Sequence, residues 1–219
     1  HFDTLKLNEF LIKKAKQIGI TFFDDIITDY EFDDNGYLKQ VESETAIYPA
    51  DLFVDCSGFQ RLLAKQVDEF EWVSQQHNLF VDSAFAFPIE HTEDNYVPFT
   101  MAKKMPSGWM WNIPVYSRSG NGYCYSSKHS SEEEAREDVE AKLGHPIKIA
   151  KRFTFDAGHM NKTWHKNMML CGLASHFFEP LEATSMGVSV QQARLLVKFI
   201  EDESDDHEAY NELVQKMFE

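Results

Sequence analysis

The chain has 219 residues, 43% of them hydrophobic and 14% aromatic, which is enough for one good-sized core or two small domains. Its formal net charge of -15 repels phosphate groups and argues against nucleic acid or an anionic membrane as partner. No apolar run reaches membrane-spanning length, and the three cysteines are far apart in apolar runs, so reduced core thiols and a cytoplasmic location are expected. The first residue is His1, which predicts an excerpt of a longer protein.

The N-terminal part of the chain predicts one helix followed by short strands. Asp3 or Thr4 can cap a helix with an apolar stripe, and Gly19 ends it. Beyond Gly19 the apolar period changes to two, which predicts strands at 20–23, 26–32, 37–41 and 46–54. The last strand runs into residues 55–58, Asp-Cys-Ser-Gly, where Gly58 either lets the backbone approach a ligand closely or simply makes a turn.

The middle of the chain predicts an antiparallel sheet with one helix. Strands are expected at 79–87, 96–103, 109–116, 123–128 and 147–155, with proline or glycine in most of the loops between them. A capping-box pattern of Ser130 or Ser131 with Glu133 or Glu134 predicts a helix that ends near Gly144. Trp109 and Trp111 are two positions apart, so on a strand both indoles face the same side. An aromatic core ladder would account for such a pair.

The C-terminal part is organised around residues 172–187, GLASHFFEPLEATSMG. They follow an expected buried strand and precede a helix with apolar periodicity, which Thr184 or Ser185 can cap. Glu182 therefore lies just before a helix N-terminus, whose free N–H groups suit a halide, a phosphate or an anionic cofactor ring. The carboxylate of Glu182 can act in catalysis there, or it can simply help to cap the helix.

Metal binding has little support in the sequence. His159 and His165 are a candidate pair, but no further ligand has convincing spacing, and scattered surface histidines are far commoner. No metal site is therefore expected.

Two motifs, in this order, resemble those of the flavin-dependent halogenases, the tryptophan halogenase family. The first is GWMWNIP at residues 108–114, in which Trp-x-Trp-x-Ile-Pro is the family's own signature. The second is FFEPLEAT at residues 177–184. Three further stretches fit the family's pattern: residues 1–3, 50–58 and 120–127. The resemblance extends from His1 to about Ile200.

This resemblance implies an α/β fold, that of the two-domain FAD/NAD(P)-binding flavoproteins of the monooxygenase type. The excerpt would lack the N-terminal Gly-rich βαβ unit and would carry an antiparallel sheet on the substrate side. Four parts are expected: part of a FAD-binding domain at 1–78, the sheet with one helix at 79–155, a return to the FAD-binding domain at 156–200, and an acidic linker with a C-terminal helix at 201–219.

The implied activity is halogenation of an aromatic, indole-like substrate that depends on FADH2 and O2. A flavin hydroperoxide would oxidise a halide ion to hypohalous acid, which travels through a tunnel to the substrate. A separate flavin reductase would supply FADH2, a role in antibiotic biosynthesis is implied, and a homodimer is left open. The catalytic lysine and the Gly-rich FAD motif are expected before His1, so the excerpt alone is expected to be inactive.

The resemblance also assigns roles to individual residues. Glu182 is the implied catalytic carboxylate, which stabilises a cationic ring intermediate and accepts its proton. The implied cofactor-binding residues are Asp55, Ser57, Gly58, Trp109, Trp111, Thr184 and Ser185. Thr184 and Ser185 would also bind the halide, and Ser185 stands where many relatives have glycine. The bulk of Trp109 and Trp111 would keep organic substrates away from the flavin.

Two other classes of protein share parts of this pattern. A flavin-dependent monooxygenase or oxidoreductase of the same fold would share residues 55–58 but has no need of paired tryptophans. A non-catalytic descendant would use the aromatic sheet to bind a partner protein or an aromatic ligand. The presence of both tryptophans together with Glu182 favours the halogenase.

Overall fold

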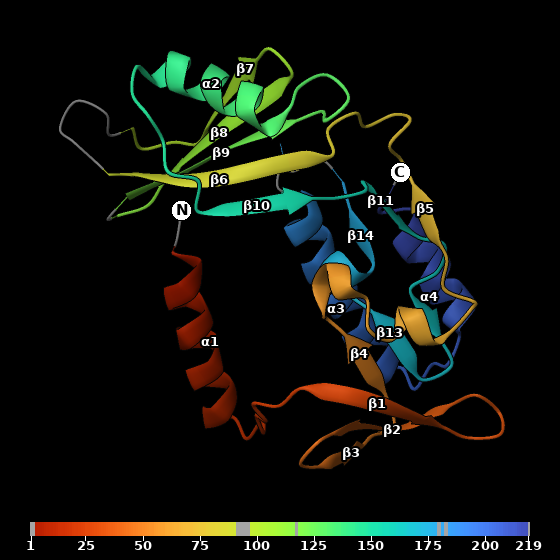
Figure 1. Ribbon diagram of the computed structural model, residues 1–219. Coiled ribbons are helices and arrows are strands. Elements are labelled where there is room, and N and C mark those ends of the chain that lie inside the picture. The colour runs from red at the N-terminus through yellow and green to blue at the C-terminus, as the bar shows by residue number, and fades with distance from the viewer. Residues whose placement is uncertain (1–2, 91–96, 117, 179–180, 182–183, 219) are drawn as a thin grey trace. The chain divides into compact units, whose positions relative to one another are not determined.

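The computed structural model describes residues 3–90, 97–116, 118–178, 181 and 184–218 (Figure 1). The chain folds into two compact units. The first unit comprises His1–Phe23 and Asn78–Phe155, and the second comprises Asp24–His77 and Asp156–Glu219. This division places the N-terminal helix with the sheet, whereas the four-part division expected from the sequence kept residues 1–78 together. Which unit binds FAD stays a prediction.

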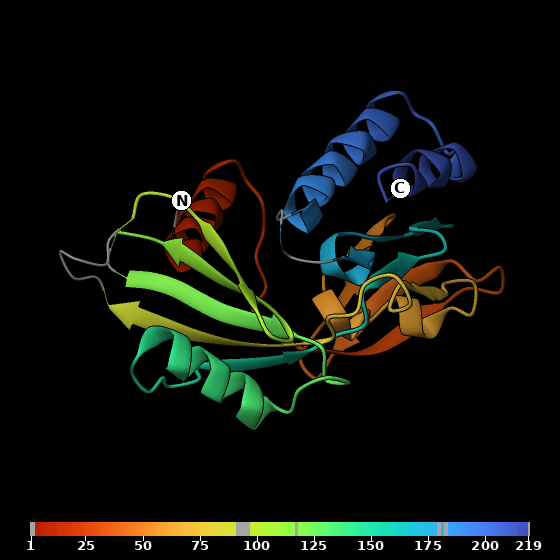
Figure 2. The same cartoon turned by 90° about the horizontal axis from the view of Figure 1, so that it is seen from above.

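The first unit is a five-stranded antiparallel sheet in the order β10-β6-β9-β8-β7. Its strands are β6 (Ser83–Glu90), β7 (Met101–Met105), β8 (Gly108–Pro114), β9 (Arg118–Tyr125) and β10 (Lys151–Thr154). Helix α2 (Glu132–Leu143) lies along one face of the sheet in Figure 1 and again in Figure 2. Phe85, Met110 and Tyr123 face one another across neighbouring strands and form the core beneath α2 with Ala135 and Val139.

The ends of α2 follow the sequence closely. Ser131 and Glu134 form a complete capping box, in which each side chain accepts a hydrogen bond from the other residue's backbone N–H. Gly144 ends the helix with φ at 79°, a conformation that costs glycine little. Two strong local signals therefore define the ends of this helix.

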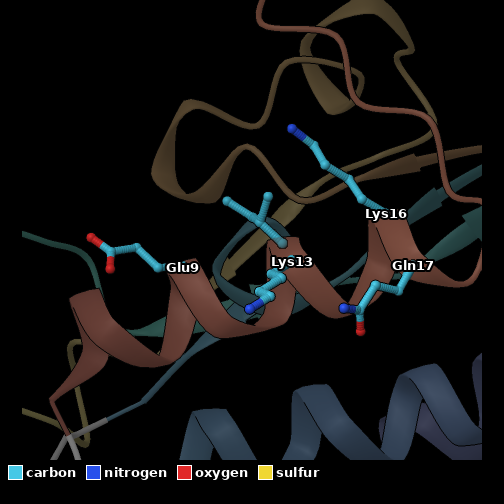
Figure 3. A pocket seen from close by; sticks show the side chains of 5 residues that line it. Glu9, Lys13, Lys16 and Gln17 are labelled. Carbon is cyan, nitrogen blue, oxygen red and sulfur yellow. The ribbon is translucent and has the colours of Figure 1, made fainter.

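Helix α1 (Thr4–Gln17) also begins where expected, since Asp3 Oδ1 accepts a hydrogen bond from the N–H of Leu5 at 3.0 Å. None of its residues is buried, and Ile18, just beyond it, is 78% exposed. Figure 3 shows a surface depression on α1; all its lining residues come from this helix: Glu9, Ile12, Lys13, Lys16 and Gln17. The expected apolar stripe is therefore present but uncovered in this chain.

The second unit contains three small sheets, with strand orders β1-β2-β3, β14-β11-β5 and β12-β13-β4. The strands are β1 (Ile27–Phe32), β2 (Leu38–Ser43), β3 (Ile47–Pro49), β4 (Phe53–Asp55), β5 (Trp72–Ser74), β11 (Gly158–Met160), β12 (Trp164–His165), β13 (Met168–Leu170) and β14 (His176–Phe177). The helices are α3 (Thr184–Glu201) and α4 (His207–Gln215), with short 3-10 turns η1 (Gly58–Gln60), η2 (Ala64–Gln66) and η3 (Gly172–Ala174).

Strand β13 lies at the centre of this unit. Met168 and Leu170 point into a core with Phe53 and Leu63, while Met169 points to the other face and packs with Trp164 and Tyr210. Since both faces of β13 are covered, its sequence is continuously apolar rather than alternating. Helix α4 contributes Tyr210 and Val214 to the second core, so the end of the chain is an integral part of the unit.

Several elements differ from the sequence-based expectations. Residues 20–23 form no strand, and residues 46–54 form two strands, β3 and β4, which belong to different sheets. The expected loop at 156–164 contains β11, and β5 was not expected at all. Strands of two or three residues are too short to show a period of two, which explains these errors. Helix α3 begins at Thr184, so Thr184 and Ser185 lie in its first turn rather than before it.

The cysteines also differ from expectation. Cys124 is buried, but Cys56 is exposed and Cys171 is half-buried. Moreover, Cys56 and Cys171 are close in space, because β4 and β13 pair in parallel. The expectation of three separate core thiols was therefore wrong for two of them.

Two general features concern the part of the chain that the structure describes. No helix in it is both long and apolar enough to cross a bilayer. Within the same residues, no group of three or more histidine, cysteine, aspartate or glutamate side chains is arranged to hold a metal ion. His165 instead lies 3.7 Å from Glu69, and His159 packs against the ring of Phe218.

Candidate functional site

The loop after β4 is shaped by the carboxylate of Asp55, which is only 5% exposed. One oxygen accepts a hydrogen bond from the N–H of Ser57 at 2.8 Å, and the other accepts from the N–H of Leu63 at 2.8 Å. Both oxygens of Asp55 are thus used to hold its own loop. The side chain supports the backbone of the expected cofactor-binding residues, and a contact with a cofactor would have to use the remaining lone pairs.

Gly58 begins η1 with φ at 69°, in the left-handed region that residues with a side chain rarely adopt. A Cβ placed there would meet only Leu173, at 4.0 Å, so the conformation and not crowding requires glycine. The hydroxyl of Ser57 accepts a hydrogen bond from the N–H of Leu62 at 3.0 Å, which closes the turn. The loop therefore has a defined shape without a ligand.

A cavity of about 220 Å³ adjoins this loop. It is lined by Asp55, Cys56 and Ser57 together with apolar side chains that include Tyr30 and Val41. It is smaller than the roughly 300–1,000 Å³ typical of a site that encloses a drug-sized ligand. It has room for a part of a cofactor and not for the whole of FAD.

The turn at residues 172–176 is tied to helix α3 by a buried polar network. The hydroxyl of Ser175 bonds with the amide of Gln192 and donates to the carbonyl oxygen of Gly172 at 3.0 Å. His176 Nε2 lies 3.2 Å from the carbonyl oxygen of Ser185, in the first turn of α3. The N-terminus of α3 is thereby fixed to the turn that precedes it.

His176 is fully buried, and this burial lowers the pKa of its imidazole below the ordinary value of 6.5. The backbone hydrogen bond with Ser185 acts in the opposite direction but is the smaller effect. The ring packs against Phe178 and Phe218. A neutral imidazole thus bridges the turn and the helix near neutral pH.

The second unit brings together two of the predicted site segments, residues 55–58 and residues 172–187. The turns η1 and η3 are in contact, η3 contacts α3, and the rings of Phe59 and Phe177 meet edge to face at 5.2 Å. Ser57, Gly58, Thr184 and Ser185 therefore all belong to the region around η3. Thr184 is exposed and Ser185 is half-buried. Glu182, the predicted catalytic residue, lies outside the described residues.

The predicted tryptophans belong to the first unit. Trp109 pairs with Cys124 and Trp111 with Gly122, so both indoles project from the sheet face opposite α2. Their ring centroids are 6.0 Å apart, and both side chains are half-buried. They are not part of the core beneath α2, and their role beside a flavin stays a prediction.

Arg61 is a feature that the sequence reasoning missed. Its guanidinium lies 3.5 Å from the ring centroid of Trp72, whose indole N–H donates to Asp156 at 3.0 Å. Burial lowers the pKa of Arg61, and the nearby charge of Asp156 partly offsets that effect. An arginine three residues after the Asp-Cys-Ser-Gly run was the only available signal, because Trp72 and Asp156 approach it through tertiary contacts.

Known flavin-dependent halogenases have the same fold. The flavin-dependent halogenase BrvH from Brevundimonas sp. BAL3 superposes with a TM-score of 0.91 at 27% identity, over 99% of this chain and 45% of that protein. The tryptophan 6-halogenase SttH from Streptomyces toxytricini superposes with a TM-score of 0.90 at 31% identity, over 98% of this chain and 44% of that protein.

The sequence comparisons agree with the fold. The model of the family described as tryptophan halogenase matches residues 1–219, so the chain belongs to the tryptophan halogenase family. Tryptophan 7-halogenase RebH from Lentzea aerocolonigenes is 36% identical over 210 residues, which cover 93% of this chain and 40% of that protein. The chain thus spans less than half the length of these relatives.

Proposed function

We propose that the full-length protein is a halogenase that uses FADH2 and O2 to oxidise a halide ion to hypohalous acid and then halogenates an aromatic, indole-like substrate. The observation that carries the proposal is the indole pair of Trp109 and Trp111 on the sheet face opposite α2, within a chain of the tryptophan halogenase family. Two half-buried indoles that lie outside the core beneath α2 are compatible with the wall of a tunnel.

The second unit fits the FAD that this function needs. Ser57 and Gly58 form a turn beside a cavity large enough for part of a cofactor. Asp55 stabilises this turn by accepting a hydrogen bond from the N–H of Ser57. Bound FADH2 would supply the oxygen chemistry that oxidises the halide. Ser57 and Gly58 would bind and orient it, and Trp109 and Trp111 would exclude organic substrates from its reactive side.

Thr184 and Ser185 are proposed to hold the halide and to contact the cofactor. Both lie in the first turn of the 18-residue helix α3, where backbone N–H groups lack partners inside the helix and the helix dipole favours an anion. His176 contacts this turn through the carbonyl oxygen of Ser185 and does not use the backbone N–H groups of the turn. The proposed halide contact would use those backbone N–H groups and no side-chain atoms, so a serine at position 185 can serve it.

Glu182 is proposed as the catalytic carboxylate. Electrophilic substitution on an aromatic ring builds positive charge and ends with loss of a proton, and a carboxylate serves both needs. A separate flavin reductase is proposed as the source of FADH2, the cytoplasm as the location, and antibiotic biosynthesis as the setting. A homodimer remains compatible with all of this.

A halide-dependence assay on the full-length protein with a flavin reductase tests the proposal. Tryptophan, indole, phenol and pyrrole substrates are each incubated with chloride, bromide or no halide, and products are analysed by mass spectrometry. Halogenated product that requires added halide is expected. Halide-independent oxygenated product would identify a monooxygenase, and binding without turnover would identify a non-catalytic aromatic-binding protein.

Variants at the two tryptophans test the observation behind the proposal. Replacing Trp109 and Trp111 together by phenylalanine keeps the bulk and should leave halogenation largely intact. The double alanine variant should consume FADH2 without halogenated product, or should lose several kcal/mol of stability, because large side chains are removed. Unchanged coupled turnover in the double alanine variant would remove these residues from the proposed tunnel.

A further inference from the structure

Two cysteines end neighbouring strands of the second unit. Strands β4 and β13 pair in parallel, with Val54 opposite Met169 and Asp55 opposite Leu170. Cys56 and Cys171 are the next residues on each strand, and the N–H of Cys171 donates to the carbonyl oxygen of Asp55 at 3.0 Å. The ladder therefore continues as far as the two cysteines and places them opposite each other.

This placement suits a disulfide. Neighbouring strands lie about 4.8 Å apart, and opposed residues on them project to the same side. Disulfides join cysteines whose Cα atoms are about 4.4–6.8 Å apart. The backbone thus already holds Cys56 and Cys171 at a separation that a disulfide can bridge, without a rearrangement of either strand.

The two thiols are also in contact, and the contact makes them chemically different. A hydrogen bond from Cys171 lowers the pKa of the Cys56 thiol, although burial and the charge of Asp55 oppose that shift. The same contact raises the pKa of Cys171, and burial raises it further. The two shifts therefore favour the thiolate, which is the nucleophilic form, on Cys56 and the protonated thiol on Cys171.

Solvent exposure also differs between the two thiols, and it favours Cys56 as the thiol that reacts first. Cys56 is exposed, whereas Cys171 is half-buried with its Sγ 3.8 Å from the carbonyl oxygen of Ser189 in α3. Cys124, in the first unit, is fully buried. An exposed thiolate next to a second thiol is the usual arrangement of a peroxide-sensitive pair.

We propose that Cys56 and Cys171 form a redox-active pair that closes a disulfide when the protein meets hydrogen peroxide. The Cys56 thiolate attacks one peroxide oxygen, so that an S–O bond forms, the O–O bond breaks and hydroxide leaves. Cys171 then attacks the sulfur of the resulting sulfenic acid, so that the S–S bond forms, the S–O bond breaks and a second hydroxide leaves. The protons of the two thiols convert both hydroxides to water, so two thiols and one peroxide give one disulfide and two waters.

The disulfide would join the two loops that flank the proposed flavin site. Ser57 follows Cys56 directly, and Gly172, the first residue of η3, follows Cys171 directly. Oxidation would therefore restrain both loops at once. Any effect on FAD binding rests on the proposed function, whereas the thiol chemistry does not.

The test uses the full-length protein, reduced and then treated with stoichiometric hydrogen peroxide. Free thiols are alkylated, the protein is digested without reductant, and peptides are identified by mass spectrometry. The expected result is a linked pair of peptides that contain Cys56 and Cys171, and dithiothreitol should separate them again. Cys56 that stays a free thiol, or that links to any other cysteine, would overturn the proposal.

Serine variants separate the two roles. In Cys171→Ser, Cys56 should stop at the sulfenic acid and react with dimedone; in Cys56→Ser, Cys171 should remain a thiol. Cys124→Ser is the matched control and should form the same disulfide as the unchanged protein. If Cys56 reached the sulfinic acid equally fast with and without Cys171, the pair would have no resolving role and the proposal would fail. FAD titration of the same samples is a separate readout, so a failure of the proposed function would leave the peptide result intact.

Discussion

In the sequence, Glu182 comes two positions before Thr184, the first residue of helix α3. Glu182→Gln in the full-length protein should lower ring halogenation by about 10²-fold or more, since a group that stabilises positive charge and accepts a proton is lost. Flavin binding and oxygen consumption should stay largely intact. Product formation is measured by chromatography, with oxygen uptake measured alongside.

Glu179→Gln is the control for that measurement. Glu179 precedes Pro180, and the sequence therefore predicts a structural role for it, so its loss should act on stability or cofactor binding and not on the chemical step. Normal product formation by Glu182→Gln would leave helix capping as the role of Glu182.

Gly122 makes a second prediction possible at the scale of single residues. A Cβ at this position would overlap the indole of Trp111 and lie 2.6 Å from the carbonyl oxygen of Phe85, so Gly122→Ala should destabilise the protein by roughly 1–3 kcal/mol. Gly120→Ala on the same strand is the matched control, because its nearest neighbours would be 3.7 Å away. Chemical denaturation of both variants decides the point. Equal stability would mean that Trp111 does not occupy the space above Gly122.

Single residues also show where sequence reasoning ends. Asp55 was predicted to bind the cofactor, which stays a prediction; the sequence did not show that both of its oxygens accept hydrogen bonds from backbone N–H groups of its own loop. That arrangement depends on how the chain turns after Ser57, which no local pattern encodes. The contact of Cys56 with Cys171 was hidden for the same reason, since it depends on the parallel pairing of β4 with β13.

At the scale of elements, predictability follows the strength of local signals. The capping box of Ser131 with Glu134 and the left-handed Gly144 define the ends of α2 locally, and its bounds were predicted well. The same holds for α1, which Asp3 caps. Strands β5, β11 and β12 have only two or three residues each, and their pairing partners determine them. Tertiary context therefore decides the short strands, and local sequence decides the long helices.

The stability of the protein should respond to pH through His176 of β14, which contacts the first turn of α3. Burial lowers its pKa in the folded protein, so the unfolded chain binds a proton more readily in the range below about 6.5. The stability that His176 contributes is present above that value and is lost as the pH falls below it. Thermal unfolding of the full-length protein at several pH values between 5 and 8 measures the effect.

Two variants isolate the contribution of this imidazole. His176→Phe keeps a ring against Phe178 and Phe218 but cannot titrate, so it should flatten the dependence of the melting temperature on pH, although the loss of two hydrogen bonds lowers the temperature itself. His77→Gln alters an exposed histidine of the same unit and should keep the slope. Burial also lowers the pKa of His165 and His207, so part of the dependence of the melting temperature on pH should persist in His176→Phe. If that dependence were not reduced at all, it would be due to His165 and His207 and not to His176.

For the molecule as a whole, the two units are not separable along the sequence. The chain passes from one unit to the other near residues 23, 77 and 155, so each unit is assembled from two distant segments. The family resemblance predicted the fold class and the antiparallel sheet, which the solved halogenase structures confirm. It did not predict that residues 1–23 belong with the sheet, because that grouping arises from contacts such as Asp3 with Arg118 at 4.0 Å.

The last prediction concerns residues 1–219 expressed alone. Helix α1 buries none of its residues, and apolar side chains on and just after it are more than half exposed: Leu5, Phe10, Leu11 and Ile18. Exposed apolar surface of this kind promotes association, so the isolated segment should be poorly soluble or loosely packed.

It should also bind FAD far more weakly than the full-length protein, because a preshaped turn beside a cavity of about 220 Å³ can hold only part of the cofactor. Fluorescence titration of both proteins with FAD makes the comparison. A well-folded segment with the same affinity as the full-length protein would mean that the whole cofactor site lies within residues 1–219, and the roles given to Gly58, Thr184 and Ser185 would have to be reassigned.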